Sequence, residues 1–322
     1  MHARHLYSLE DIAVTEPAWV TIGVFDGVHR GHQRLVEALV SEAHSKNRLA
    51  IVLTFFPHPD VVLKGITGRY YLMSPEQRAE YLLNLGVDFV VTQPFDDQVR
   101  RMPALHFVNR LVEQLKMAEL WVGADFALGH KREGNVDFLR QQGELQGFAV
   151  RTVDLVEHDE GGLVINSTAL REWLREGRVD QVRHWLGRAY SVVGLVEHGQ
   201  KRGRTIGFPT ANLKIWSEQI VPANGVYAGW ATVDGQRFMA LTNVGVRPTF
   251  AEQDITIESY LLDFSGELYG RSIHLTFEER LRAEQRFNGV EELVRQIEKD
   301  VDAGREVLTR QAQSSSPGLG AR

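Results

Sequence analysis

Two histidines three residues apart, His29 and His32, follow a run of apolar residues and stand beside Gly27 and Gly31. The run 19–25 is typical of a strand buried on both faces, and apolar residues at helical spacing after it predict a helix. Both histidines then lie on one face of the first helical turn, where free N–H groups and the helix dipole favour an anion. This arrangement predicts a phosphate site in which the histidines stabilise charge that develops during displacement at phosphorus.

Simpler interpretations of this pair exist. A His-x-x-His pair is more often only surface polarity, and as a metal site it would supply too few ligands. Two observations favour the phosphate site instead. The glycines let a ligand approach the backbone closely, and the pair stands at the carboxyl end of an expected parallel strand, where ligands of open α/β sheets bind.

A second polar segment, 199–212, is rich in glycine and basic residues but lacks the Gly-Lys-Ser/Thr sequence of a Walker A loop. Its glycines permit close approach to a nucleotide, and its basic side chains match phosphate charge. Thr210 and Asn212 share a face of an extended chain, where their neutral oxygens suit a magnesium ion that ATP phosphates also hold. On the residues alone, a solvated surface loop is the better interpretation of such a segment.

The elements that must position these residues differ between the two halves of the chain. The first half alternates apolar runs with helical patterns, and this order predicts a Rossmann-like, doubly wound parallel sheet of the α/β class. One helix has clear limits, because Ser74 and Pro75 supply an N-cap and a first helical position and Gly86 supplies a stop. The apolar runs cover 19–25, 49–56, 87–92 and 120–123, and the helical patterns cover 31–43, 74–86 and 103–115.

After about residue 187 the pattern changes to strands in which apolar and polar residues alternate, as in Ile273 and His274. Alternation predicts an antiparallel sheet with one wet face, which we expect to form a small β-barrel or a sandwich. One helix, over 289–308, follows it. The expected strands cover 190–198, 225–233, 237–244, 255–263 and 272–278.

The chain of 322 residues is long enough for two domains of roughly 150 residues each. We expect a first domain over 1–187, a second over 188–312, and a disordered tail rich in Ser and Gly over 313–322. The sequence has no cysteine, which excludes a disulfide scaffold, a thiolate zinc site and a thiol nucleophile.

Charge and hydropathy exclude further classes. The 36 Lys and Arg residues against 42 Asp and Glu residues give a net charge of −6, which does not suit a nucleic-acid-binding protein. No apolar run reaches the roughly 18 residues of a membrane span, and the first ten residues lack the apolar core of a signal peptide. We therefore expect a cytoplasmic protein with no nucleic-acid or membrane partner, whose oligomeric state the sequence leaves open.

The histidine segment matches a known pattern. Residues 23–32 read Gly-Val-Phe-Asp-Gly-Val-His-Arg-Gly-His and resemble the signature of the nucleotidylyltransferase superfamily. The form resembles that of bacterial bifunctional riboflavin kinase/FMN adenylyltransferases, and segments 55–59, 123–129 and 167–171 resemble further motifs of that family in the same order. Three residues depart from the family pattern: Leu128 replaces an aromatic residue, Ala169 replaces an arginine, and Asn166 replaces a serine.

The second half resembles the riboflavin kinase module of the same family. Residues 209–212, Pro-Thr-Ala-Asn, resemble the kinase signature, and residues 243–250 resemble a loop on the flavin side. Glu258 and the residues after it also match. The resemblance spans about residues 15–302 and has ordered motifs in both halves.

The resemblance implies two reactions: phosphorylation of riboflavin by ATP to FMN, and transfer of AMP from a second ATP to FMN, giving FAD and pyrophosphate, with Mg²⁺ as cofactor. It implies His29 and His32 as catalytic residues of the second reaction. It implies Glu258 as the general base that takes the proton of the terminal ribityl hydroxyl. Without the resemblance, Glu258 could not be chosen over Glu252 or Glu267.

The resemblance also implies three binding sites. The adenylyltransferase ATP site comprises Gly23, Phe25, Asp26, Gly27, His29, His32, Ser167, Thr168 and Arg171. The flavin site comprises Phe56, Pro57, His58, Asp125, Phe126 and Arg247. The kinase ATP site comprises Gly199, Lys201, Gly203, Arg204, Gly207, Pro209, Thr210 and Asn212, of which Thr210 and Asn212 hold the metal.

Alternatives stay open at this point. Ser167 and Thr168 can serve only as a helix cap, and Phe56 and Phe126 can be ordinary core residues. For the whole chain, the alternatives are a riboflavin kinase with a degenerate first module and a catalytically silent flavin-nucleotide sensor. The departures at Leu128 and Ala169 are the only support for the silent sensor.

Overall fold

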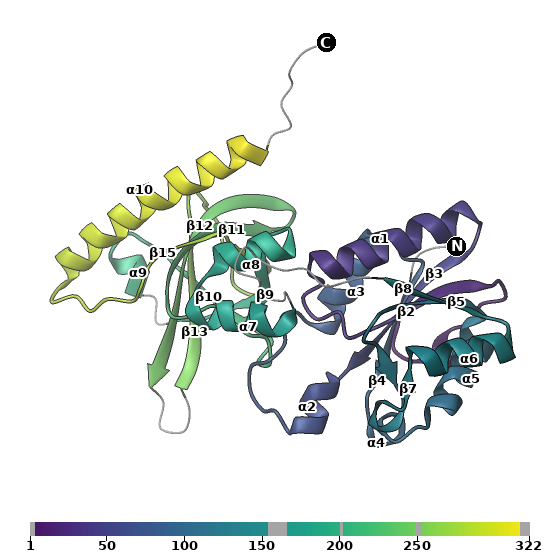
Figure 1. The fold of residues 1–322 in the computed structure, drawn as a ribbon. Coiled ribbons are helices and arrows are strands. Elements are labelled where there is room, and N and C mark those ends of the chain that lie inside the picture. Colours follow the sequence, from purple (N-terminus) through teal and green to yellow (C-terminus); the bar gives the residue numbers. More distant parts are fainter. Residues whose placement is uncertain (1–3, 154–165, 200–201, 249–252, 316–322) are drawn as a thin grey trace, which may run out of the picture. The chain divides into compact units, whose positions relative to one another are not determined.

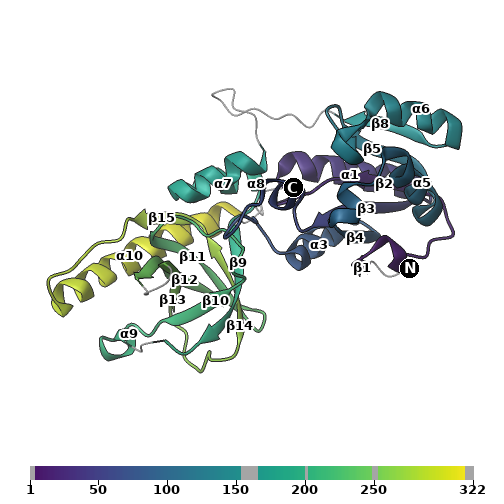
Figure 2. The same ribbon diagram turned by 90° about the horizontal axis from the view of Figure 1, so that it is seen from below.

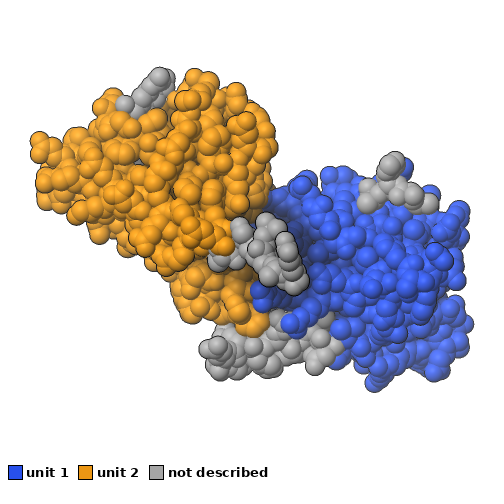
Figure 3. All heavy atoms as spheres, turned by 90° about the horizontal axis from the view of Figure 1, so that it is seen from above, with its two compact units in different colours: residues 1–167 blue, residues 168–322 orange. Residues whose placement is uncertain are grey.

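The computed structural model describes residues 4–153, 166–199, 202–248 and 253–315. Contacts divide the chain into two units, Met1–Ser167 and Thr168–Arg322, which Figure 3 shows in different colours. None of the helices in this part of the chain combines the length and apolar character that crossing a membrane requires.

The first unit contains a six-stranded parallel sheet in the order β1-β4-β3-β2-β5-β8. Figure 1 shows α1 on one side of this sheet and α5 and α6 on the other, which confirms the expected doubly wound α/β fold. The strands are β1 (Arg4–Leu6), β2 (Ala18–Ile22), β3 (Leu49–Phe56), β4 (Phe89–Pro94), β5 (Met117–Gly123) and β8 (Ala149–Val153). The helices are α1 (Arg30–Ser45), α2 (Pro59–Lys64), α3 (Pro75–Asn84), α4 (Asp97–Arg100), α5 (Ala104–Leu115) and α6 (Val136–Gln146), and a short ribbon joins β6 (Ala127–Leu128) to β7 (Gly134–Asn135).

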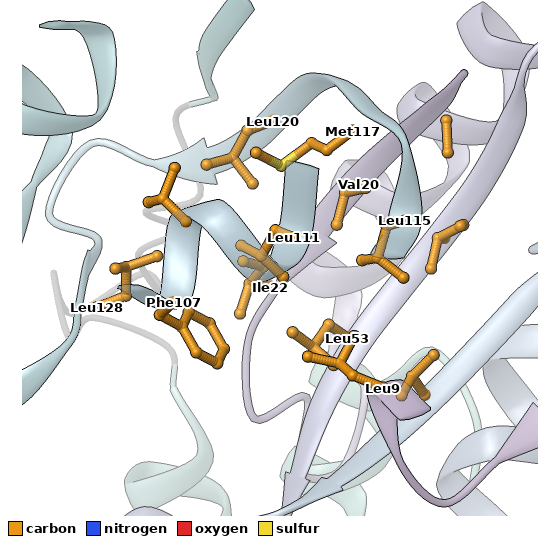
Figure 4. Packing of buried hydrophobic residues seen from close by; sticks show 14 of the residues in the cluster. Leu9, Val20, Ile22, Leu53, Phe107, Leu111, Leu115, Met117, Leu120 and Leu128 are labelled. Carbon is orange, nitrogen blue, oxygen red and sulfur yellow. The ribbon is translucent and has the colours of Figure 1, made fainter. Parts of the chain in front are cut away.

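Burial on both faces of the sheet explains the apolar runs in the sequence. Val20 and Ile22 of β2 belong to the cluster that includes Leu111 of α5, which Figure 4 shows from close by. Trp19 points to the opposite face and belongs to the cluster of Leu39 of α1. Successive residues of a strand face opposite sides, so a strand covered on both sides must be apolar throughout.

Two strands of this sheet, β1 and β8, were not predicted from the apolar runs of the sequence. Strand β8 lies at one edge of the sheet, and three of its five residues are exposed, so it gives no apolar run. Strand β1 lies at the other edge and has only three residues. The expected start of the helix after Ser74 is confirmed. Ser74 is the N-cap of α3 and forms a capping box with Gln77, and Pro75 lies in the first turn.

The second unit is an antiparallel barrel, which confirms the barrel among the two expected alternatives. The pairing runs β12-β13-β10-β9-β14-β11, and β11 pairs again with β12, which closes six strands. The strands are β9 (Tyr190–Glu197), β10 (Ala211–Ile215), β11 (Gly225–Val233), β12 (Gln236–Pro248), β13 (Gln253–Leu261) and β14 (Ser272–Phe277), with β15 (Glu279–Arg282) added to β11. A short helix, α9 (Arg202–Thr205), lies between β9 and β10.

The C-terminal helix α10 (Val290–Ser315) contacts β11, β12 and β15, and Figure 2 shows it beside these strands. Its residues Val307 and Leu308 are buried against Ala228 and Leu241 of the barrel. The helix continues to Ser315, so the expected tail starting at 313 begins inside it. Residues 316–322 lie outside the described residues.

Helices α7 (Ser167–Glu176) and α8 (Val179–Leu186) belong to the second unit apart from Ser167, whereas the sequence boundary after Gly187 assigns them to the first. The Ala223 amide donates to the Leu174 carbonyl at 2.8 Å, and Arg183 forms an ion pair with the buried carboxylate of Glu278 at 3.2 Å. The change to alternating apolar residues near 187 marks the first barrel strand. It does not mark the start of the unit, because two amphipathic helices precede that strand.

These contacts predict a difference between two fragments of the second unit. A fragment of residues 188–315 lacks α7 and α8 and leaves Glu278, which is 9% exposed, without Arg183. We expect it to unfold about 10 °C or more below a fragment of residues 168–315, since a loss of 1 kcal/mol lowers the midpoint by several degrees. Circular dichroism on heating measures both midpoints, and equal midpoints would show that α7 and α8 do not stabilise the barrel.

Candidate active sites

The chain leaves β2 through a loop with an unusual backbone. Phe25, Gly27 and Val28 have φ angles of 52°, 83° and 41°, and the Val28 amide donates to the Phe25 carbonyl at 3.1 Å. A β-branched residue such as Val28 is rarely found at positive φ, and such strain is concentrated at functional sites. Both Phe25 and Val28 are fully buried, so packing holds the loop in this conformation.

Asp26 fixes the middle of the same loop. Its carboxylate is 1% exposed and accepts from the Leu72 amide at 3.0 and 3.1 Å. Its backbone carbonyl accepts from the Ser167 hydroxyl at 2.8 Å. The structure thus brings together two residues that the sequence assigned to the ATP site.

His29 and His32 stand at the start of α1 with their rings stacked and the centroids 3.7 Å apart. His29 is 7% exposed, and the Nδ1 atom of His32 is buried without a hydrogen-bond partner in the described part of the chain. Burial, followed by the charge of His29, holds the pKa of His32 well below its ordinary value of 6.5. A neutral ring with an unsatisfied nitrogen suits a site that is completed by a polar ligand.

Phe56, Pro57 and His58 of the expected flavin site lie at the end of β3 and directly after it. Because Ile22 and Leu53 pair in parallel strands, the loops after β2 and β3 leave the sheet at the same end. His58 is 8% exposed, its amide donates to the Tyr71 hydroxyl at 3.1 Å, and the Phe56–Pro57 peptide is cis.

Asp125 and Phe126 have different surroundings. Asp125 is exposed, and its carbonyl accepts from Arg132 at 2.8 Å. Phe126 packs against the core cluster that contains Leu128, as expected if it is an ordinary core residue. Leu128 is 7% exposed in that core, where an aliphatic side chain serves as well as the aromatic residue of the family pattern.

The remaining residues of the first motif set lie on α7. Thr168 and Arg171 fall in the second unit, and Arg171 is 3% exposed. Ala169 is 5% exposed, so a residue as large as arginine has little room in this conformation. The phosphate contacts of Thr168 and Arg171 stay predictions.

The barrel register brings the candidate kinase residues together. Asn212 of β10 lies directly opposite Glu258 of β13, and Glu258 lies directly opposite Asn243 of β12. Residues opposite each other in neighbouring strands project from the same face, so the three side chains form one row. Asn243 lies in the segment 243–250, of which the sequence indicates only Arg247 as a site residue, because the importance of Asn243 depends on the pairing of β12 with β13.

Two members of this row, Asn243 and Glu258, line a cavity of about 350 Å³ in the second unit. Thr210, Asn243 and Glu258 line it on the polar side. The other lining residues include the apolar side chains of Ile206, Phe208, Val226, Leu241, Tyr260, Phe287, Leu293 and Ile297. Arg282 also lines the cavity and is held by a two-point ion pair with the carboxylate of Asp300.

Close packing explains two glycines of the predicted kinase loop. A Cβ atom on Gly199 would collide with the Asn212 amide, and one on Gly203 would collide with the Phe208 carbonyl. Gly207 has a φ of 89°, and Pro209 is exposed. Lys201 and the side chains of Arg204 and Arg247 lie outside the described residues.

Comparison with known proteins assigns both halves. A model of the FAD synthetase family matches residues 11–169, and a model of the riboflavin kinase family matches residues 186–308. A bifunctional riboflavin kinase/FMN adenylyltransferase of Pseudomonas fluorescens is 40% identical over 88% of this chain and 91% of its own. The Escherichia coli K12 enzyme of the same name is 36% identical over 94% and 96%.

A solved structure from Streptococcus pneumoniae is similar over 95% of this chain and 99% of its own, with a TM-score of 0.85 and 27% sequence identity. That protein is called a macrolide-efflux protein, a description that concerns it alone. The two family models together support two activities over the kinase-only and silent-sensor alternatives.

The low pKa of His32 predicts a pH dependence of stability. A histidine whose folded-state pKa lies below its unfolded value stabilises the fold fully above pH 6.5, and this contribution is lost as the pH falls below 6.5. The loss amounts to at most about 1.4 kcal/mol per pH unit. We therefore expect the wild type to lose more stability than His32→Gln between pH 7.5 and 5.5, measured as the midpoint of the first unit by calorimetry. Parallel curves for the two proteins would contradict this prediction.

Proposed function

The chain belongs to the family of bifunctional riboflavin kinase/FMN adenylyltransferases, and we propose that the loop after β2 and the row across β10, β13 and β12 carry its two reactions. The enzyme phosphorylates riboflavin with ATP to give FMN and then transfers AMP from ATP to FMN to give FAD. The assignment of residues to steps is the proposal. The observation that carries it is the convergence of Thr210, Asn243 and Glu258 on one cavity.

The cavity has the properties that riboflavin requires. Its volume of about 350 Å³ lies in the range of small-molecule sites, roughly 300–1,000 Å³. The rings of Phe208 and Tyr260, whose centroids are 5.5 Å apart, offer an apolar surface for the flat isoalloxazine ring. Glu258 and Thr210 offer polar groups for the ribityl chain and the phosphates.

In the kinase step, Glu258 accepts the proton of the terminal ribityl hydroxyl while that oxygen bonds to the γ-phosphorus of ATP. The bond between the γ-phosphorus and the bridging oxygen breaks, and ADP leaves. The segment from Gly203 to Asn212 holds the phosphates, and the open space beside Gly207 permits their close approach to its backbone.

Mg²⁺ fits the oxygen donors of this site. Thr210 and Asn212 would hold it, and both offer the neutral oxygens that Mg²⁺ accepts when phosphates supply the negative charge. When bound, the ion neutralises charge on the β- and γ-phosphates.

In the adenylyl step, a phosphate oxygen of FMN bonds to the α-phosphorus of ATP, and pyrophosphate leaves. This oxygen is already ionised near pH 7, because the second pKa of a phosphate monoester is about 6, so the step needs no general base. His29 and His32 then act as hydrogen-bond donors to the phosphates. The unsatisfied Nδ1 of His32 supports this role.

Both reactions consume ATP, and the sequence has no cysteine. We therefore place the enzyme in the cytoplasm, with riboflavin, FMN and ATP as its small-molecule partners.

The histidines generate the first test of this assignment. Replacing His29 or His32 with Ala should slow FAD formation from FMN by about 10²–10³-fold, the usual effect of losing one donor to a transition state. Formation of FMN from riboflavin in the same protein should stay within twofold of the wild type and serves as the internal control. Chromatography of the flavins measures both rates, and normal adenylylation in both variants would exclude the histidines from the step.

Glu258 generates the reciprocal test. Glu258→Gln should slow FMN formation by about 10²–10⁴-fold, since it removes the general base, and should leave conversion of supplied FMN to FAD unchanged. Glu267→Gln, at an exposed position outside the cavity lining, is the matched control. Glu284 is a second carboxylate of the cavity, so full kinase activity in Glu258→Gln and its loss in Glu284→Gln would transfer the role to Glu284.

A further inference from the structure

Arg78 lies on α3, outside every motif and every residue assigned above. Its side chain is 1% exposed. Its NH1 group donates to the Val24 carbonyl at 2.8 Å, and its NH2 group donates to the Phe55 carbonyl at 3.0 Å. Val24 lies in the loop after β2, and Phe55 lies near the end of strand β3, directly before the Phe56-Pro57-His58 segment. One guanidinium therefore joins the backbone of the first loop to the end of the strand from which the second loop starts.

A buried cation at this position is costly for the fold. Burial lowers the pKa of Arg78, a sign that its charged form loses solvation, although the nearby Asp26 opposes this effect. Its Nε atom is buried without a hydrogen-bond partner in the described residues. An apolar side chain of similar length would pack in the same place without these costs. A guanidinium, unlike an apolar side chain, has two donors at a fixed spacing that bond to two carbonyls at the same time.

The segment that leads into α3 makes two further connections to the same loops. The Leu72 amide donates to the Asp26 carboxylate in the first loop. The Tyr71 hydroxyl accepts from the His58 amide in the second loop, and the Tyr71 ring lies 5.6 Å from that of Phe56. Residues 71–78 thus contact both loops through backbone, side-chain and ring interactions, and Arg78 bonds both to the first loop and to the end of β3 that leads into the second.

We propose that Arg78 is a positioning residue for adenylyl transfer, which sets the distance between the loop that holds ATP and the loop that holds FMN. The proposal rests on the assignment of ATP to residues 23–32 and of FMN to residues 56–58. The reaction requires a phosphate oxygen of FMN to lie within bonding reach of the α-phosphorus of ATP. A displacement of about 1 Å between two substrates can cost about 10²-fold in rate, so a fixed spacing between the loops is a direct contribution to catalysis.

The test compares Arg78→Met, Arg78→Lys and Leu82→Ala in the full chain. Methionine keeps the apolar stem but removes both donors, and we expect the kcat of FMN adenylylation to fall about 10–100-fold. Lysine keeps a charge but has one nitrogen for two carbonyls, and we expect a fall of about three- to tenfold. Leu82 lies on the same helix, is fully buried and makes no contact with either loop's backbone through hydrogen bonds, so Leu82→Ala controls for loss of stability.

All rates are measured below the unfolding midpoints of every variant, together with riboflavin kinase activity, which reports on the second unit. We expect kinase turnover within twofold of the wild type in all variants, a lower midpoint but normal adenylylation kcat in Leu82→Ala, and KM values for ATP and FMN that change less than kcat in the Arg78 variants.

Three results would overturn the proposal: wild-type adenylylation kcat in Arg78→Met, wild-type kcat in Arg78→Lys, or an equal loss in Leu82→Ala. If Arg78→Met does not fold, Arg78→Lys decides alone. His32→Ala separates this proposal from the site assignment. Loss of adenylylation in His32→Ala with normal rates in both Arg78 variants removes only the positioning role, whereas normal rates in His32→Ala remove the ATP loop on which the proposal rests.

Discussion

The sharp exit of the chain from β2 is the constraint on which the first site depends. Non-glycine residues at positive φ cost of order 1–3 kcal/mol each and persist only where their surroundings determine them. Here Phe25 and Val28 are held by burial. Thr54 and Arg78 donate to the Val24 carbonyl before them, and between them the Asp26 carbonyl accepts from Ser167 and the Asp26 carboxylate accepts from the Leu72 amide. Because these contacts fix the loop, they also fix where α1 begins, with His29 at its N-cap and His32 in its first turn.

Closure of the barrel has the corresponding role in the second unit. Glu258 has Asn212 on one side and Asn243 on the other only in the observed register, since a slip of one residue would turn every side chain of β13 to the opposite face. The register is secured on the other face of the same strand, where Ile257 and Ser259 are buried. The apolar interior of the barrel and the polar row of the site are thus two results of one pairing.

Features that depend on short stretches of chain could be predicted from the sequence. These include the strand and helix that flank His29, the N-cap at Ser74 and the alternation around Ile273. Features that depend on pairing could not. Asn243 becomes a candidate site residue only through its strand partner Glu258, fifteen residues away. Arg78 resembles any polar residue of a helix in the sequence, because its two carbonyl acceptors lie 54 and 23 residues away.

The boundary between the units shows why motif and packing need not agree. The motif at 167–171 begins with Ser167, whose hydroxyl bonds to the loop of the first unit, yet the helix that it opens receives the Ala223 amide at Leu174 in the second. The family model of the first half includes the start of this motif and runs to residue 169. Contacts follow the helix, and so the second unit starts at Thr168. The match of the family model and the contacts of the second unit therefore overlap within the first turn of α7, so neither boundary alone describes the chain.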